Sequence, residues 1–191
     1  MAEKNNPPVL TTLCYLERDG KYLMLHRTKK EHDINKDKYI GIGGHFEFGE
    51  SPDECLVREA KEETGLTLTS YRARGIVTFI YGIGSEPICE YMHLYTADGW
   101  KSGSGNVGTT ESSKLSEPKI LPDCSEGDLV WIDKKDVYDL PIWEGDRIFF
   151  RLLEEDRDFF SLKLVYSEDG DLKEAILDGQ RLSINRMHAL G

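Results

Sequence analysis

The chain has 191 residues, 39% of them hydrophobic and 10% aromatic, so it is long enough for one folded domain and too apolar to be disordered. No stretch approaches the roughly eighteen consecutive apolar residues of a membrane-spanning helix, and residues 1–8 carry no apolar signal region. A formal net charge of -11 disfavours binding to a nucleic-acid polymer, so we expect a cytoplasmic protein that engages neither a membrane nor a nucleic acid.

The predicted elements begin with two strands, residues 9–17 and 22–27, which Asp19-Gly20 joins as a hairpin. A polar and charged stretch follows, up to residue 38. A glycine-rich run that ends at Gly44 then leads toward the first helix.

That helix is predicted from Ser51 to Thr64 by signals at both of its ends. Ser51 is the expected N-cap, Pro52 occupies the first helical position, and Glu54 completes a capping box with Ser51. Gly65 supplies the residue that ends the helix.

The second half of the chain mixes strands with one helix. The pattern predicts strands at 74–83 and 88–97, a polar insertion loop at 98–122, a short strand at 129–132, a helix at 147–153, a hairpin of strands at 160–166 and 172–177, and a tail at 178–191. Because strands and helices do not alternate regularly, we expect an α+β protein with a mixed β-sheet, and we expect residues 1–191 to form a single domain.

Three acidic residues lie on one face of the predicted first helix. Glu59, Glu62 and Glu63 are spaced at i, i+3 and i+4, so their side chains project in similar directions. A solvated acidic face is one interpretation, because such like-charge pairs cost only about 0.2–0.5 kcal/mol in water. If the face is partly buried, the repulsion rises to about 4 kcal/mol per pair, which favours a role as ligands of a divalent cation.

The segment from Gly44 to Leu66 resembles a known motif. Gly44, Glu50 and the run Arg58-Glu59-Ala60-Lys61-Glu62-Glu63-Thr64-Gly65-Leu66 match the Nudix box, Gx5Ex7REUxEExGU, in which U is aliphatic. Ala60 is smaller than the residue usual at its position. The resemblance to Nudix hydrolases implies an α/β/α sandwich in which a mixed sheet lies between helices.

The resemblance also implies a metal site. In Nudix enzymes the positions of Glu59 and Glu63 hold the metal, helped by that of Glu62 and by the backbone carbonyl at the position of Gly43. Mg²⁺ is the implied cofactor, with Mn²⁺ as an alternative. The run 126–131 is similar to the segment before a late strand where MutT-type enzymes carry a further acid, which makes Glu126 a fifth candidate ligand.

Catalytic roles follow from the same resemblance. Glu62 or Glu126 could take the proton of a metal-bound water, beside the ligand Glu63. Glu126 could instead be a turn residue ahead of a strand. Glu50 and Arg58 are expected to orient the loop and the helix through a charged pair, and the alternative for them is an ordinary surface ion pair worth at most about 1 kcal/mol.

Base-binding residues are implied by a likeness to the MutT-like 8-oxo-dGTP diphosphatase branch. In that branch a Trp stacks on the purine and an Asp bonds its edge, which assigns these roles to Trp143 and Asp146; the alternatives are a core tryptophan and a helix cap. Tyr39 and His45 belong to the entry segment that resembles WNGFGGK, in which the branch often has Trp and Lys instead. Arg27 belongs to a basic stretch that either attracts the triphosphate or forms a solvated loop.

The sequence thus predicts a Mg²⁺-dependent enzyme that cleaves a nucleoside triphosphate, (d)NTP, into (d)NMP and pyrophosphate. A purine nucleotide is the expected substrate, with 8-oxo-dGTP as one candidate. One alternative is another nucleoside diphosphate derivative, such as ADP-ribose, a nucleotide sugar or a dinucleoside polyphosphate. Another is a non-catalytic nucleotide sensor. The expected partner is this small molecule alone, and the expected state is a monomer or a homodimer.

Overall fold

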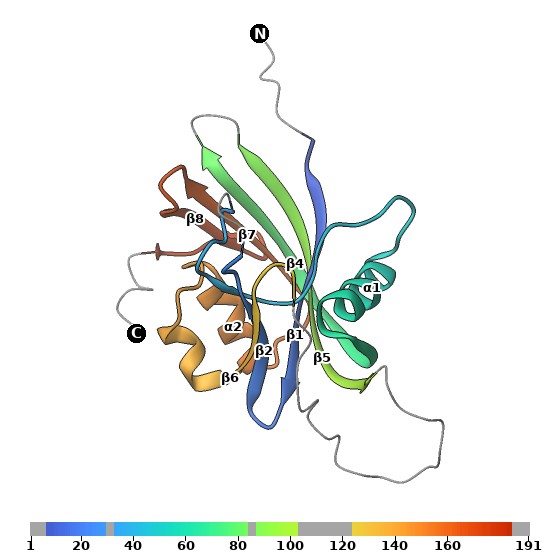
Figure 1. Cartoon of the computed structure of the whole chain (residues 1–191). Helices are drawn as coiled ribbons and strands as arrows, with labels where there is room; N and C mark the ends of the chain where they lie inside the picture. Colours follow the sequence, from blue (N-terminus) through green and yellow to red (C-terminus); the bar gives the residue numbers. More distant parts are fainter. Residues whose placement is uncertain (1–6, 30–32, 84–86, 103–123, 185–191) are drawn as a thin grey trace.

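A mixed β-sheet runs through the computed structural model, which describes residues 7–29, 33–83, 87–102 and 124–184 (Figure 1). The strand order is β3-β2-β1-β5-β4-β7-β8-β9, and β6 pairs with β2 off this path. The strands are β1 (Val9–Arg18), β2 (Lys21–His26), β3 (Tyr39–Ile40), β4 (Leu66–Ile83), β5 (Ile88–Ser102), β6 (Asp128–Asp133), β7 (Phe160–Ser167), β8 (Leu172–Leu177) and β9 (Gln180–Arg181), and the helices are α1 (Pro52–Thr64), the 3-10 helix η1 (Lys134–Asp139) and α2 (Asp146–Glu154).

The direction of pairing makes the sheet mixed, as predicted. β1 runs parallel to β5 and β4 runs parallel to β7, whereas the other paired strands are antiparallel. The parallel pairs bring segments that are distant in sequence into one sheet, and they place the start of β1 beside the start of β5.

Local sequence signals account for the first hairpin and for α1. Asp19 and Gly20 both have positive φ angles, 48° and 76°, the backbone that a tight two-residue hairpin requires. Ser51 and Glu54 form the predicted capping box. Gly65 ends α1 in the left-handed region with a φ of 69°, where its N–H donates to the carbonyl of Lys61.

The alternation of side chains along β1 separates two hydrophobic cores. Cys14 and Leu16 are fully buried in the cluster that contains Leu56 and Ala60 of α1. Tyr15 lies between them in sequence and is buried in the other cluster, with residues of α2. The two helices therefore cover opposite faces of the sheet, and the expected α/β/α sandwich is confirmed (Figure 1).

Several predicted boundaries differ from the observed ones, most of all at β4, which begins at Leu66 where the strand was expected to begin at residue 74. The insertion loop was expected to begin at residue 98, but β5 continues to Ser102 because this end pairs with the start of β4 and buries Trp100, which is 3% exposed. Residues 103–122 of that loop lie outside the described residues, as do 185–191 of the tail. The short elements β3, η1 and β9 were not predicted. No helix in the described ranges is long and apolar enough to cross a membrane.

Candidate active site

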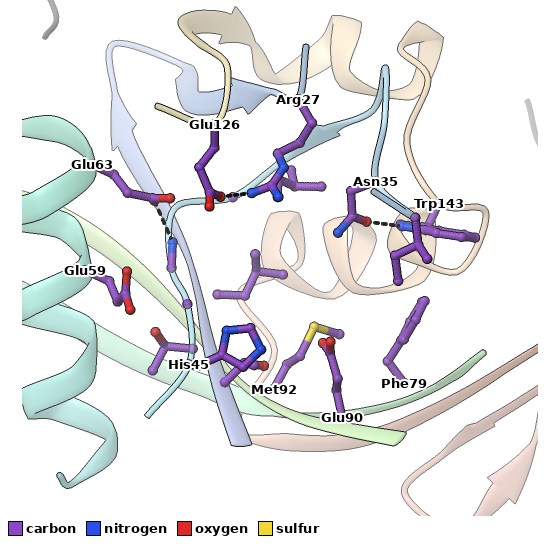
Figure 2. A pocket seen from close by; sticks show the side chains of 18 of the residues that line it. Arg27, Asn35, His45, Glu59, Glu63, Phe79, Glu90, Met92, Glu126 and Trp143 are labelled. Carbon is purple, nitrogen blue, oxygen red and sulfur yellow. Dashed lines mark hydrogen bonds and ion pairs between the residues drawn. The ribbon is translucent and has the colours of Figure 1, made fainter. Parts of the chain in front are cut away.

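A cavity of about 330 Å³ opens on the side of the sheet where β1, β5 and the glycine-rich run meet. This volume lies within the range usual for small-molecule sites, about 300–1,000 Å³. Figure 2 shows its two ends, with carboxylates from α1 and the segment before β6 at one end and aromatic side chains at the other. The lining residues include Thr11, Thr12, Leu13, Arg27, Ile34, Asn35, Ile40, Gly41, Gly43, Gly44, His45, Glu59, Glu63, Phe79, Glu90, Met92, Glu126, Trp143 and Asp146.

Glu63 is a partly buried acid of the carboxylate end. Its carboxylate accepts a hydrogen bond from the backbone N–H of Gly43 at 3.0 Å, which ties α1 to the glycine-rich run. Burial, together with the negative charges of Glu126 and Glu59, raises the pKa of Glu63 to about 8. A nearby cation would stabilise the ionised form of this group.

Glu59 reaches the same end because Gly44 has no side chain. A Cβ atom at Gly44 would lie 2.5 Å from the carboxyl carbon of Glu59, far inside ordinary contact. The Glu59 carboxylate also accepts a hydrogen bond from Nη1 of Arg58 at 2.8 Å. The glycine in the box is therefore a steric requirement for the position of this acid.

Glu62 is not brought to the cavity. It was predicted to help hold the metal and was one of two candidates for the general base, but its side chain is 58% exposed and lies 3.3 Å from Nη1 of Arg58. Successive residues of a helix turn by about 100° around its axis. Seen along that axis, Glu62 and Glu63 therefore project to opposite sides of Glu59 and lie about 100° from each other. The predicted shared face therefore contains Glu59 and Glu63 only.

Arg58 joins the helix to the loop that precedes it. Its Nε donates to Oε1 of Glu50 at 2.7 Å and its Nη2 donates to Oε2 at 3.0 Å, so the expected charged pair is present as a bidentate fork. The same Nη2 donates to the carbonyl of His45 at 2.9 Å. The hydrogen bond from Arg58 is the main reason that the pKa of Glu50 falls to about 2.

Arg27 is engaged with two acids. Its Nε donates to Asp33 at 2.8 Å, and its Nη1 forms an ion pair with Glu126. Arg27 lines the cavity, and its main contact there is with Glu126, which it holds at the carboxylate end (Figure 2).

Trp143 is buried in the core and also reaches the cavity. It is 8% exposed and packs edge-on against Phe79 and Tyr166, and it also lines the cavity. Its indole N–H donates to Oδ1 of Asn35 at 2.7 Å, and Nζ of Lys38 lies 4.6 Å from the centre of its ring.

Asp146 also lines this end of the cavity. Burial raises the pKa of Asp146 to about 8. The alternative role of helix cap is not observed, because the N-cap of α2 is Gly145 and no side chain caps the helix.

Of the two residues predicted in the entry segment, His45 lines the cavity and Tyr39 does not. His45 lines the cavity near Glu90, whose pKa is raised by burial. Tyr39 does not line it, because neighbouring strand residues point to opposite faces and Ile40 takes that place. The ring of Tyr39 instead stacks on that of His26, with centroids 4.2 Å apart.

The carboxylate end fits a hard divalent cation. Within the described ranges, no group of three or more His, Cys, Asp or Glu side chains is arranged to hold a metal ion. Mg²⁺ needs fewer, because it usually takes one or two carboxylates and completes its shell with water and substrate phosphates. Glu59 and Glu63 offer oxygen donors only, and the pKa of Glu63 is raised by burial and, to a smaller extent, by the negative charges of its neighbours. This donor set suits Mg²⁺ or Mn²⁺ better than a soft metal.

Comparisons with known proteins agree with this geometry. Residues 7–153 match the NUDIX domain family. A Nudix hydrolase of Bacillus subtilis is 27% identical over 172 residues, which cover 90% of this chain and 95% of the relative. The oxidized purine nucleoside triphosphate hydrolase of Danio rerio is 24% identical over 150 residues, 78% of this chain and 82% of the relative.

Solved structures show the same fold. The MutT protein of Bacillus halodurans superposes with a TM-score of 0.71 at 22% identity, over 89% of this chain and 97% of that one. The MutT protein of Methanosarcina mazei gives 0.60 at 19% identity, over 81% and 98%. The chain therefore belongs to the Nudix family and is a hydrolase that acts on pyrophosphate bonds, and its fold is similar to that of MutT proteins.

Proposed function

We propose that this Nudix hydrolase cleaves purine nucleoside triphosphates into nucleoside monophosphate and pyrophosphate with Mg²⁺. The observation that carries the proposal is that one cavity joins partly buried carboxylates at one end to Trp143 and Phe79 at the other. Such a cavity can hold the phosphates and the base of one nucleotide at the same time. In this assignment the phosphates lie beside Glu59 and Glu63.

The proposed roles of the acids follow from their contacts. Glu59 and Glu63 would hold Mg²⁺, with the carbonyl of Gly43 as a further oxygen ligand. The bound ion would neutralise phosphate charge and make a water more acidic. Glu126 lines the same end and would accept the proton of the attacking water, and Arg27 keeps its carboxylate facing that end.

Arg58 and Glu50 would act as positioning residues rather than as reacting groups. Their fork and the hydrogen bond from Arg58 to the carbonyl of His45 fix α1 against the loop, and a third hydrogen bond from Arg58 fixes Glu59. Metal sites depend on such support, since losing it typically costs about 10–100-fold in metal affinity or activity.

At the other end the base would lie against Trp143 and Phe79, with Asp146 at its edge. The raised pKa of Asp146 keeps this carboxyl neutral at pH 7, so that its O–H can donate to the base. The name of the Danio rerio relative, a hydrolase of oxidized purine nucleoside triphosphates, supports a purine substrate and makes 8-oxo-dGTP the first candidate. A cytoplasmic location and a monomeric or homodimeric state stay predictions from the sequence.

A substrate panel tests the proposal. Initial rates with Mg²⁺ are measured for 8-oxo-dGTP, dGTP, dCTP and ADP-ribose, for the wild type and for Glu63→Gln. Glu155→Gln, at an exposed position of the α2 C-terminus, is the matched control. We expect the purine triphosphates to be turned over fastest, in the control as in the wild type, and Glu63→Gln to lose this activity. ADP-ribose turnover far above that of every triphosphate would contradict the proposal.

A further inference from the structure

Asn35 presents a hydrogen-bond donor to the aromatic end of the cavity. Its Oδ1 accepts the indole N–H of Trp143 at 2.7 Å, and its amide nitrogen faces the cavity (Figure 2). The two atoms cannot exchange places, because an indole N–H is a donor only and needs the oxygen opposite it. The orientation of the amide is therefore set by chemistry.

The segment that carries Asn35 is fixed on both sides. The backbone N–H of Asn35 donates to Oδ1 of Asp33 at 2.9 Å, and Asp33 is held by Arg27. The carbonyl of Asn35 accepts the N–H of Lys38 at 3.0 Å, and the Lys38 ammonium lies over the ring of Trp143. Because the amide is already held in place, binding a ligand to it costs little conformational entropy.

Among the described residues that line the cavity, Asn35 carries the only side-chain amide. Asparagine usually recognises adenine with both of its polar atoms, the oxygen accepting from the 6-amino group and the nitrogen donating to the ring. Here the oxygen is directed at Trp143, so only the NH₂ is offered to a base. The NH₂ group can donate a hydrogen bond to a carbonyl oxygen of a base, but it cannot accept one from an amino group.

We propose that Asn35 is a specificity-determining residue whose NH₂ group donates to a carbonyl on the purine edge, so that the site prefers 6-oxopurine nucleotides to 6-aminopurine nucleotides. This inference rests on the proposed function, because it places the base at the aromatic end. The substrate class is thereby narrowed to guanine-like and hypoxanthine-like nucleotides. A mismatch of this kind leaves a polar group unpaired, which corresponds to a discrimination of about tenfold or more.

The matched substrates are dITP and dATP, which differ at position 6 and in the protonation of the adjacent ring nitrogen. We expect the wild type to show a kcat/KM for dITP at least about tenfold above that for dATP. Asn35→Asp keeps an oxygen for Trp143 and replaces the NH₂ by a second acceptor, so the ratio should fall to about 1 or invert. The added charge repels both nucleotides equally, and the ratio is therefore the readout.

The control variant is Asp37→Asn in the same segment. Asp37 is exposed, and its φ of 62° suits asparagine as well, so this exchange should leave the dITP/dATP ratio unchanged. A ratio near 1 in the wild type, or a ratio that Asn35→Asp does not change, would overturn the inference.

Binding without turnover separates this inference from the proposed function. Calorimetry with dIMP and dAMP, in the absence of metal, measures the base preference alone. Tighter binding of dIMP that is lost in Asn35→Asp supports the role of Asn35 even if no triphosphate is hydrolysed, in which case only the proposed function fails. Equal binding of the two monophosphates, or binding of neither, contradicts the inference.

Discussion

Gly44→Ala is the substitution that tests most sharply how the glycine-rich run positions a metal ligand. The new Cβ would lie 2.5 Å from the carboxyl carbon of Glu59, whereas ordinary contact begins at 3.4 Å. The backbone cannot retreat easily, because the carbonyl of Gly44 accepts the N–H of Thr12 at 2.9 Å. Glu59 must therefore move by about 0.9 Å, the difference between these two distances.

The displaced group is the end of a flexible side chain, so we expect the fold to tolerate the change. A shift of about 1 Å in a catalytic site can cost about 100-fold in rate, and we expect kcat/KM for pyrophosphate release to fall by that order. Thermal unfolding of the same variant should remain near that of the wild type. Gly99→Ala is the control. Its Cβ would lie 2.8 Å from the Cβ of Ser70, and neither residue lines the cavity, so this change should affect stability alone.

A double-substitution cycle shows whether the effect passes through Glu59. In a Glu59→Ala background the Cβ at Gly44 meets no carboxylate, so the second change should cost little more. The reasoning is refuted if Gly44→Ala keeps the kcat/KM of the wild type, or if its full loss persists without the Glu59 carboxylate.

Three further predictions follow from the contacts of single residues. Glu63→Gln should lower kcat at least about tenfold more than Glu62→Gln, because only Glu63 lines the cavity; equal losses in parallel rate assays would contradict this placement. Arg58→Lys loses the fork to Glu50, so the Mg²⁺ concentration for half-maximal activity should rise about tenfold, and an unchanged metal titration would argue against a positioning role. Asp146 has a pKa raised from 3.8 to about 8, so the folded state binds a proton that the unfolded state releases between these values. The free energy of unfolding should therefore fall as pH rises from about 4 to 8, and Asp146→Asn should reduce this slope; denaturant titrations with the same slope in both proteins would disprove the shift.

The sequence predicted the parts of this molecule that depend on neighbouring residues. The capping box of Ser51 and Glu54 and the tight turn at Asp19-Gly20 are set by local backbone chemistry, and both are present. The Glu50–Arg58 pair was expected from the box, and its geometry agrees with that expectation.

What the sequence did not predict depends on contacts over long distances. Phe79, Glu90 and Met92 line the cavity because β4 and β5 pair with each other and β5 lies beside β1, an arrangement without a local signal. Asn35 stood in a charged stretch, and its role became visible only with Trp143 beside it, 108 residues further along the chain. The extension of β5 to Ser102 likewise required its partner strand.

Backbone geometry accounts for the two predicted site residues, Glu62 and Tyr39, whose side chains do not line the cavity. Glu62 shares the acidic pattern of its neighbours, but the exact helical angle turns it toward Arg58. Tyr39 sits next to lining residues in sequence, and strand alternation turns its ring toward His26. In both cases the motif identified a segment that contributes to the cavity. The direction of each side chain, however, is determined by the backbone conformation of its helix or strand.

Analysis of the products of one reaction tests whether the protein releases pyrophosphate in a metal-dependent reaction. The wild-type protein is incubated with dGTP and Mg²⁺ in ¹⁸O-labelled water, and the products are identified by ³¹P NMR. We expect dGMP and pyrophosphate, with the reaction abolished by a chelator and restored by added Mg²⁺. Release of dGDP and orthophosphate, or the same rate in the presence of the chelator, would contradict it.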